Sequence, residues 1–367
     1  MEEQIISRNP FSRTRLPVSS TLPMLGGVLK IKCHKVVVFC CSLISVIIIF
    51  HYFKSNNNSY PPNGFLESVE DTYRHYRGSR KRINPLDFTY TIPGEKICGH
   101  RSPFLLIFVV SLHTRRSQRD AIRSTWGSVS IGKPWPRSQY GNQPSNPPPN
   151  LFTKVVFLFG YHPNDTHNRE LLHESAQHND VVQANFTESY RNLTRKVLMG
   201  LKWARQYCPQ AKFVMKIDDD TFVNVPMVFD YLLSKDVWER TIMGFINIDS
   251  IPFRLYTKWQ VSWSEYPYMR YPIYTSGNIY VFLFRTSCLL LDVAEYIPYV
   301  SMEDVYITGI LAEVIHAKHR LIPLKWYSPY KTASPCELAT NKKMASQMIT
   351  AKLHYLVWKA MQEKICD

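Results

Sequence analysis

Short apolar runs alternate with amphipathic stretches through the middle of the chain. Residues 104–112, 155–159 and 213–217 are almost entirely apolar and have the length of buried strands. The spacing of polar and apolar residues between these runs predicts helices and one short strand: helices over 119–126, 169–178 and 193–208, and a strand over 180–183. Apolar strands that alternate with helices predict an α/β fold with a mostly parallel sheet covered on both faces.

Residues 36–53 form an apolar run of another kind, because they contain no Asp, Glu, Lys or Arg. About 17–25 apolar residues cross a bilayer core of roughly 30 Å. A buried core helix and a cleaved signal peptide are the alternatives. Lys35, Lys54 and the polar residues 56–59 around the run argue against the first, and the sequence at 48–51 lacks the small residues of a cleavage site. We therefore predict an uncleaved signal anchor.

The charges around this run predict its orientation. Only two acidic residues, Glu2 and Glu3, precede the run. Six basic residues precede it: Arg8, Arg13, Arg15, Lys30, Lys32 and Lys35. Positively charged flanks stay on the cytoplasmic side. We expect a single-pass type II membrane protein, with a cytoplasmic tail over 1–35 and all residues after 54 in a lumenal or extracellular compartment.

Features of secreted proteins occur after the predicted anchor. Asn-x-Ser/Thr sequons, which are glycosylated only in a secretory compartment, lie at Asn57, Asn164, Asn185 and Asn192. Five cysteines follow the anchor, so at least one is free or pairs between chains: Cys98, Cys208, Cys288, Cys336 and Cys366.

Two segments lack a sustained period and are rich in proline. Residues 54–97 have the composition of a lumenal stem, and residues 132–150 that of a surface loop, since proline excludes a helix or a central strand there. Residues 98–367 are expected to form the folded lumenal domain.

The net charge of +15 raises the question of nucleic-acid binding. Outside the N-terminal tail the basic residues are dispersed, and Arg80-Lys81-Arg82 is the only run of three. Together with the predicted topology, this excludes a nucleic-acid partner. The 22 Tyr, 19 Phe and 8 Trp exclude a chain that is disordered throughout.

Candidate chemistry follows the predicted strands, where α/β sheets bind their ligands. Asp218, Asp219 and Asp220 come directly after the strand at 213–217. Adjacent carboxylates repel one another unless a cation neutralises them, and Mg²⁺ or Mn²⁺ prefers such oxygen ligands. A solvated acidic turn is the alternative.

Arginines and a pair of acids follow other strands. Arg115, Arg119 and Arg123 recur every four residues, which suits phosphate recognition, although a solvated basic helix face is an equal alternative. Glu303 and Asp304 lie between apolar segments, and an acid there could be a general base. On spacing alone, a helix cap by Asp304 is favoured.

Four motifs occur in one order along the chain: RRSQRDAIRSTWG, NLTRKVLMGLKWARQYCPQAKFVMKIDDDTFVN, YPIYTSGNIYVF and EDVYITG. Together, over about residues 98–320, they resemble glycosyltransferase family 31, the β-1,3-galactosyltransferase and β-1,3-N-acetylglucosaminyltransferase group. The resemblance implies a GT-A fold, a UDP-sugar donor, Mn²⁺ (or Mg²⁺) as cofactor and residence in the Golgi membrane.

The resemblance also implies roles for single residues. Asp304, with Glu303 beside it, would be the catalytic base, taking a proton from the 3-hydroxyl of an acceptor sugar on a lipid or protein. The donor residues would be Arg115, Arg119, Trp126, Asp218 and Asp219. Asp220 and Asp218 would hold the metal with His354, for which His316 and His319 are alternatives. In-line attack would invert the anomeric carbon and give a β linkage.

Some residues depart from the family pattern. Thr275 stands where many relatives carry Cys, Asn278-Ile279 replaces two glycines, and Asn185 replaces a common Asp. None removes an expected catalytic group, but the donor sugar (galactose, GalNAc or GlcNAc) and a homodimeric state stay open.

Two functions of other classes compete with the enzyme. A membrane-tethered carbohydrate-binding protein of the same fold would lack turnover, and a metal-dependent phosphoesterase would want further His/Asp clusters that the sequence lacks.

Overall fold

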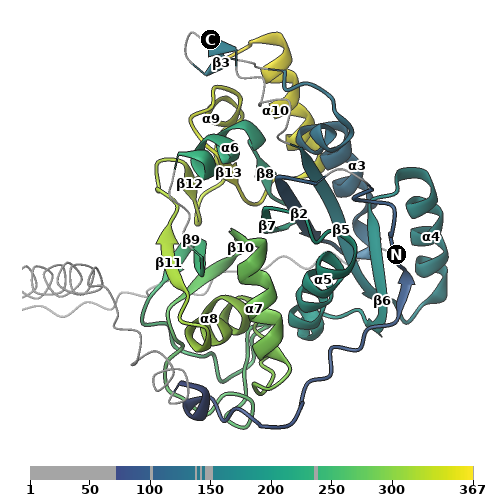
Figure 1. The fold of residues 1–367 in the computed structure, drawn as a ribbon. Coiled ribbons are helices and arrows are strands. Elements are labelled where there is room, and N and C mark those ends of the chain that lie inside the picture. Colours follow the sequence, from purple (N-terminus) through teal and green to yellow (C-terminus); the bar gives the residue numbers. More distant parts are fainter. Residues whose placement is uncertain are drawn as a thin grey trace, which may run out of the picture. The chain divides into compact units, whose positions relative to one another are not determined.

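An eight-stranded sheet organises the residues that the computed structural model describes, which are 72–99, 102–136, 139–140, 143–144, 152–234 and 239–366. Its strand order is β1-β6-β5-β2-β7-β10-β9-β11 (Figure 1). In chain order the strands are β1 (Tyr90–Ile92), β2 (Leu105–Val110), β5 (Thr153–Tyr161), β6 (Val181–Thr187), β7 (Phe213–Asp218), β9 (Thr241–Asn247), β10 (Tyr274–Leu283) and β11 (Lys318–Leu321). The α/β prediction is confirmed.

The direction of the strands decides where a site can form. β6, β5, β2 and β7 are mutually parallel, whereas β10 runs antiparallel to both β7 and β9. In the β7–β10 register, Ile217 is paired with Ile279. Gly277 and Asn278, which directly precede Ile279, therefore lie close to the end of β7, where the triple aspartate begins.

Helices cover both faces of the sheet, as the apolar strands predict. Leu106, Phe108 and Val110 of β2 belong to one apolar core, with α5 (Leu193–Tyr207), α7 (Phe284–Ala294) and α8 (Leu311–Val314). Leu105, Ile107 and Val109 belong to a second core, which includes side chains of α3 (Arg116–Ser124), α4 (Asp165–His178), α6 (Val225–Leu233), α9 (Pro335–Ala339) and α10 (Ala351–Glu363). Alternate residues of one buried strand thus supply the two cores.

Several helices begin earlier than their apolar period indicates. α4 starts at Asp165 rather than 169, because the Asn164 side chain accepts a hydrogen bond from the backbone N–H of Thr166 at 3.0 Å and caps a polar first turn. α3 starts at Arg116 rather than 119: its first turn is polar and therefore has no apolar period, and no described side chain caps it.

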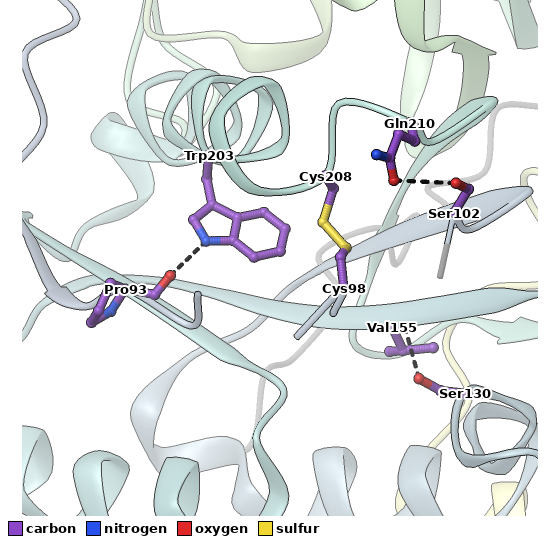
Figure 2. The surroundings of a disulfide bond; sticks show 8 residues. All are labelled: Pro93, Cys98, Ser102, Ser130, Val155, Trp203, Cys208 and Gln210. Carbon is purple, nitrogen blue, oxygen red and sulfur yellow. Dashed lines mark hydrogen bonds between the residues drawn. A yellow bond between two sulfur atoms is a disulfide. The ribbon is translucent and has the colours of Figure 1, made fainter. Parts of the chain in front are cut away.

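The stem predicted over 54–97 differs from the structure in its described part. β1 pairs with β6 in the main sheet, and Tyr76 and Leu86 are buried in an apolar core. The indole nitrogen of Trp203 on α5 donates to the carbonyl oxygen of Pro93 at 2.6 Å (Figure 2). Residues 72–97 therefore belong to the folded unit. These residues are held by contacts with residues far away in the sequence. The local pattern of polar and apolar residues therefore does not predict their structure.

Two disulfides join distant parts of the described chain. Cys98 pairs with Cys208 at the end of α5 (Figure 2), Cys336 pairs with Cys366, and Cys288 is free. The odd number of cysteines after the predicted anchor is thereby accounted for.

Smaller strands lie outside the main sheet. In the proline-rich 132–150 segment, β3 (Gln139–Tyr140) pairs with β4 (Gln143–Pro144) as a separate two-stranded ribbon. β8 (Phe222–Val223), β13 (Ala345–Ser346) and β12 (Tyr327–Ser328) form a three-stranded sheet. Within the described ranges, no helix is long and apolar enough to cross a membrane, and the predicted anchor over 36–53 lies outside them.

Candidate active site

A cavity of about 860 Å³ opens where the end of β7 meets the beginning of β10. Asp218 of β7, Gly277 and Asn278 of β10, and Glu303 and Asp304 line it. Asp218, the first of the three aspartates, and the distant pair Glu303-Asp304 therefore face one space. The cavity also has an aromatic wall, formed by Tyr190, Phe253, Trp259, Tyr271 and Tyr274.

Lys216 lies fully buried at the base of this cavity. Its ammonium group is 2.7 Å from Asp218 and 3.4 Å from Glu303, and it donates to the carbonyl oxygen of Gly277. Burial alone would lower the pKa of Lys216, but the neighbouring carboxylates outweigh this effect and raise it above its usual value. A permanent positive charge therefore links the two acidic motifs.

Asp304 is held by backbone groups on both of its oxygens. Oδ2 accepts from the N–H of Gly277 at 3.0 Å, and Oδ1 accepts from the N–H of Val305 at 2.9 Å. The second contact caps a π-helical turn over Val305–Ile310, so the capping prediction is confirmed, and the same residue lines the cavity. Burial raises the pKa of Asp304, which makes its carboxylate a stronger base.

Glu303 is buried beside Asp304. Its carboxylate accepts a hydrogen bond from the hydroxyl of Tyr280 and approaches Lys216. Burial raises the pKa of Glu303 to about 7, with Lys216 opposing the rise and Asp304 adding to it. Through these contacts Glu303 holds Lys216 and Tyr280 next to Asp304, which suits a positioning role for Glu303.

The three consecutive aspartates have different surroundings. Asp218 faces the cavity and Lys216. Asp219 is buried, accepts from the Ser111 hydroxyl at 2.7 Å and pairs with Arg115 at 3.1 Å. Burial raises the pKa of Asp219 to about 6, although Ser111 and Arg115 lower it. In the described part of the chain, no side chain donates a hydrogen bond to the carboxylate of Asp220, whose pKa burial raises.

The donor set at this strand end is compatible with a hard divalent cation. No group of three or more His, Cys, Asp or Glu side chains among the described residues is close enough to hold a metal alone. Mg²⁺ and Mn²⁺ commonly use one or two carboxylates and complete their coordination with water and substrate phosphates. Asp218 fits such a site, and so does Asp220, whose carboxylate receives no side-chain hydrogen bond from the described residues.

His354 is the third predicted metal ligand. It lies fully buried on α10, stacks on Phe222 at 5.9 Å, and neither ring nitrogen has a partner among the described residues. Burial lowers the pKa of His354 to about 3, so the ring is neutral and has a free lone pair. The alternatives are no better placed: His319 on β11 contacts the carbonyl oxygen of Thr308 at 2.5 Å, and none of His316, His319 and His354 lines the cavity. Among the described residues, His354 also forms no group of three possible ligands with Asp218 and Asp220.

The two arginines predicted to bind the donor are not equivalent. The side chain of Arg115 is 41% exposed and lies beside the triple aspartate. Arg119 is buried and makes five hydrogen bonds, two to Glu174 at 2.7 and 2.6 Å and the others to Ser111 Oγ and the carbonyl oxygens of Leu112 and His113. A guanidinium has five N–H groups, so Arg119 has none left for a phosphate. The prediction of direct donor contact by Arg119 is therefore wrong.

Trp126 also differs from its predicted role. Its side chain is completely buried in the core that contains Ile107 and Val109, so it cannot touch a nucleotide directly. It sits immediately after α3, and its packing supports the helix that carries Arg115 at its N-terminal end.

The predicted glycosylation sites differ in how exposed their residues are. Asn164 and Asn185 are exposed, whereas the Asn192 sequon uses Thr194, which is fully buried and donates to the carbonyl oxygen of Val300 at 2.9 Å. Asn57 lies outside the described residues.

Sequence reasoning missed Lys216, Tyr280 and the aromatic wall. Lys216 left a signal, because a lysine inside the apolar run 213–217 needs buried carboxylate partners. Phe253 and Trp259 of the aromatic wall had no such signal in the sequence, since their segment has no regular pattern of polar and apolar residues.

Comparison with known proteins agrees with the site. A family model described as galactosyltransferase matches residues 117–323. Beta-1,3-galactosyltransferase 5 of Homo sapiens is 36% identical over 233 residues, which cover 62% of this chain and 70% of that protein. Lactosylceramide 1,3-N-acetyl-beta-D-glucosaminyltransferase A of Xenopus laevis is 31% identical over 292 residues, covering 76% of this chain and 71% of that protein.

A third relative is UDP-GalNAc:beta-1,3-N-acetylgalactosaminyltransferase 1 of Homo sapiens, 30% identical over 225 residues, covering 60% of this chain and 63% of that protein. The matched residues of the family model include the triple aspartate, Lys216 and Glu303-Asp304, so the match contains the whole acidic side of the cavity. Because that model spans more than half of the sequence, the chain belongs to the galactosyltransferase family.

Proposed function

We propose that this chain is an inverting β-1,3-glycosyltransferase that moves a sugar from a UDP-sugar to the 3-hydroxyl of an acceptor glycan. The observation that carries the proposal is one cavity lined by both Asp218 and Asp304, a donor-side carboxylate and a base. The names of the relatives add the linkage and the three candidate sugars, galactose, GlcNAc and GalNAc.

Asp304 is the base in this proposal. It takes the proton of the acceptor 3-hydroxyl as the oxygen attacks the anomeric carbon, and the bond from that carbon to the UDP oxygen breaks on the opposite face. Hydrogen bonds from Gly277 and Val305 hold the carboxylate in one orientation before the acceptor arrives. Lys216 is fixed behind it as a counter-charge to Glu303 and Asp218.

The donor side is assigned to the end of β7, in a GT-A type arrangement. Asp218 and Asp220 would hold Mn²⁺ or Mg²⁺, with His354 as a further candidate. When bound, such an ion offsets negative charge on the leaving diphosphate. Arg115, half-exposed beside Asp219, is the described arginine placed to add a second positive charge.

The aromatic wall suits an acceptor sugar. Tyr190, Phe253 and Trp259 present exposed ring surface at the cavity, and apolar sugar faces pack on such rings. The alternative is a carbohydrate-binding protein without turnover. The geometry of Asp304 favours the enzyme, because binding alone does not need a buried carboxylate oriented by two backbone donors.

We further propose the cellular setting expected from the sequence: a type II Golgi membrane protein with its folded unit in the lumen. The exposed sequons at Asn164 and Asn185 and the two disulfides support this setting, since both modifications belong to the secretory pathway.

The experiment uses the full chain in detergent with Mn²⁺, against UDP-galactose, UDP-GalNAc and UDP-GlcNAc and a panel of acceptor sugars. We expect transfer from one donor, loss of transfer with EDTA, and a reduction of about 10²–10⁴-fold in kcat for Asp304→Asn. Asp165→Asn, an exposed carboxylate on α4, is the matched control and should keep full activity.

Donor binding separates the two functions. Folded protein that binds UDP but transfers no sugar, with Asp304→Asn binding UDP equally well, would favour the carbohydrate-binding protein over the enzyme.

A further inference from the structure

Exposed apolar side chains are concentrated in the segment between β9 and β10. Of 22 large apolar side chains exposed in the described residues, eight lie between Ile248 and Met269. Leu255 is 71% exposed and Tyr256 is 96% exposed, at the most outward part of the segment. Such clusters on a folded protein usually mark a contact surface.

The outward part is a closed loop, residues 253–261, with a fixed base. The N–H of Val261 donates to the carbonyl oxygen of Phe253 at 2.8 Å. The guanidinium of Arg254 stacks on Trp263 at 3.8 Å and donates to the carbonyl oxygens of Val261 and Tyr268 at 3.0 and 2.6 Å. The apolar tip is therefore presented by an ordered support rather than by a free strand of chain.

The 253–261 loop stands at the mouth of the proposed acceptor cavity. Phe253, Lys258 and Trp259 line the cavity, whereas Leu255 and Tyr256 do not. The two rings of Phe253 and Trp259 are 5.9 Å apart, so the cavity wall and the exposed tip belong to one unit. Whatever binds the tip is thereby placed next to the cavity.

We propose that the tip of the 253–261 loop docks on the surface of a lipid bilayer and holds the mouth of the cavity against it. The surface has the composition of an interfacial anchor: an aliphatic side chain and aromatic side chains beside Lys258, whose ammonium lies 4.8 Å from the Trp259 ring. Trp and Tyr favour the head-group region, and lysine complements lipid phosphates.

The length of chain before the folded unit also favours a bilayer. If residues 36–53 span the membrane as the sequence predicts, residues 54–71 lie between the span and the first described residue, Thr72. At about 3.3–3.6 Å per residue, these 18 residues reach at most about 65 Å, so the loop meets lipid at a high effective concentration. The docking itself does not depend on the proposed function. Its consequence, access to acceptors carried on lipid, rests on that function.

The first test measures contact directly. The full chain is reconstituted in phosphatidylcholine vesicles that contain a photoactivatable phosphatidylcholine, and labelled peptides are mapped after digestion. We expect peptides with residues 253–261 to be labelled well above peptides of α4, whose exposed Leu172 is the reference. Equal labelling of the two regions, or cross-links between two copies of the chain through this loop, would overturn the proposal.

The second test uses a tip variant, Leu255→Ser with Tyr256→Asn. Asn is chosen because Tyr256 has a positive φ of 30°, which Asn tolerates. We expect lipid labelling of the loop, and transfer to a glycolipid acceptor in the same vesicles, to fall by about tenfold. Transfer to the free oligosaccharide of the same structure should not change, and Leu172→Ser should change neither.

The outcomes keep this proposal separate from the proposed function. A wild-type chain that transfers to neither acceptor contradicts the glycosyltransferase, while the labelling still decides the docking. An equal loss on free and lipid-borne acceptors in the tip variant would overturn the docking, because it would indicate a damaged cavity.

Discussion

Two arginines one turn apart on the same segment have opposite surroundings. Arg115 is half-exposed beside Asp219, whereas Arg119 is buried in a bidentate pair with Glu174. The sequence could not separate them, because a spacing of four residues puts them on one side of a helix but does not say whether that side faces solvent or a second helix.

This contrast makes a prediction with an internal control. Arg115→Gln should raise the KM for the UDP-sugar by about tenfold, because a charge-assisted hydrogen bond contributes about 1.5–3 kcal/mol. It should lower stability less than Arg119→Gln does, because Arg115 is half-exposed and Asp219 keeps its hydrogen bond from Ser111. Arg119→Gln should lower the free energy of unfolding by about 3–5 kcal/mol, because it leaves Glu174 buried without its main partner. Steady-state kinetics and urea unfolding of both variants check this; a purely kinetic defect in Arg119→Gln would contradict it.

Glu174 also predicts how stability depends on pH. Burial alone would raise the pKa of Glu174, but Arg119 and Arg123 outweigh it and lower the pKa from 4.5 to about 2. Since the folded-state pKa is depressed, the stabilisation is complete above pH 4.5 and is lost as the pH falls towards 2.

Urea unfolding of the wild type and of Glu174→Gln at several pH values measures the stabilisation that the Glu174 carboxylate contributes. The variant should be less stable by about 3 kcal/mol near neutral pH, and the difference should shrink as the pH approaches the folded-state value. Glu170→Gln, an exposed glutamate on the same helix, should show no such pH-dependent difference. A difference for Glu174→Gln that is the same at neutral and acid pH would contradict the linkage.

At the scale of elements, the sequence predicted the parallel strands and their helices, because fully apolar runs and amphipathic periods are local signals. It did not predict β1, since three residues, Tyr90–Ile92, carry no period and are fixed by pairing with β6. It left open whether Asp304 caps a helix or belongs to a site. The cap is confirmed, and the antiparallel direction of β10 brings the N–H of Gly277 to the same carboxylate at the cavity.

The disulfide between Cys98 and Cys208 fixes the segment before β2 to the end of α5 (Figure 2). Replacing both cysteines by serine should lower stability by about 2–5 kcal/mol, because the bond closes a loop across a sequence separation of 110. Thermal unfolding measures the loss. Cys288→Ser is the control, since Cys288 is free; an equal loss in that variant would show that serine substitution itself, rather than the bond, is responsible.

At the scale of the whole molecule, the proposed orientation predicts which sequons carry glycans. When the full chain is made in mammalian cells, Asn164 and Asn185 should be glycosylated because both side chains are exposed. The double variant Asn164→Gln and Asn185→Gln should lose most of the mass shift that endoglycosidase produces. Unglycosylated wild-type chain in the membrane fraction would contradict the lumenal orientation.

Three of the five aromatic residues that line the cavity, Phe253, Trp259 and Tyr271, come from one continuous stretch of chain. Residues 248–273 leave the sheet after β9 and return at β10, and these two strands are hydrogen-bonded neighbours. The donor carboxylates, by contrast, belong to β7 and the turn after it. A different segment in place of residues 248–273 would begin and end at neighbouring strands. Such a replacement would not alter β7 or the aspartates that follow it. If the proposed assignment of acceptor and donor sides holds, most of the aromatic lining for the acceptor can change by replacing this one segment, while Asp218 and Asp220 stay in place.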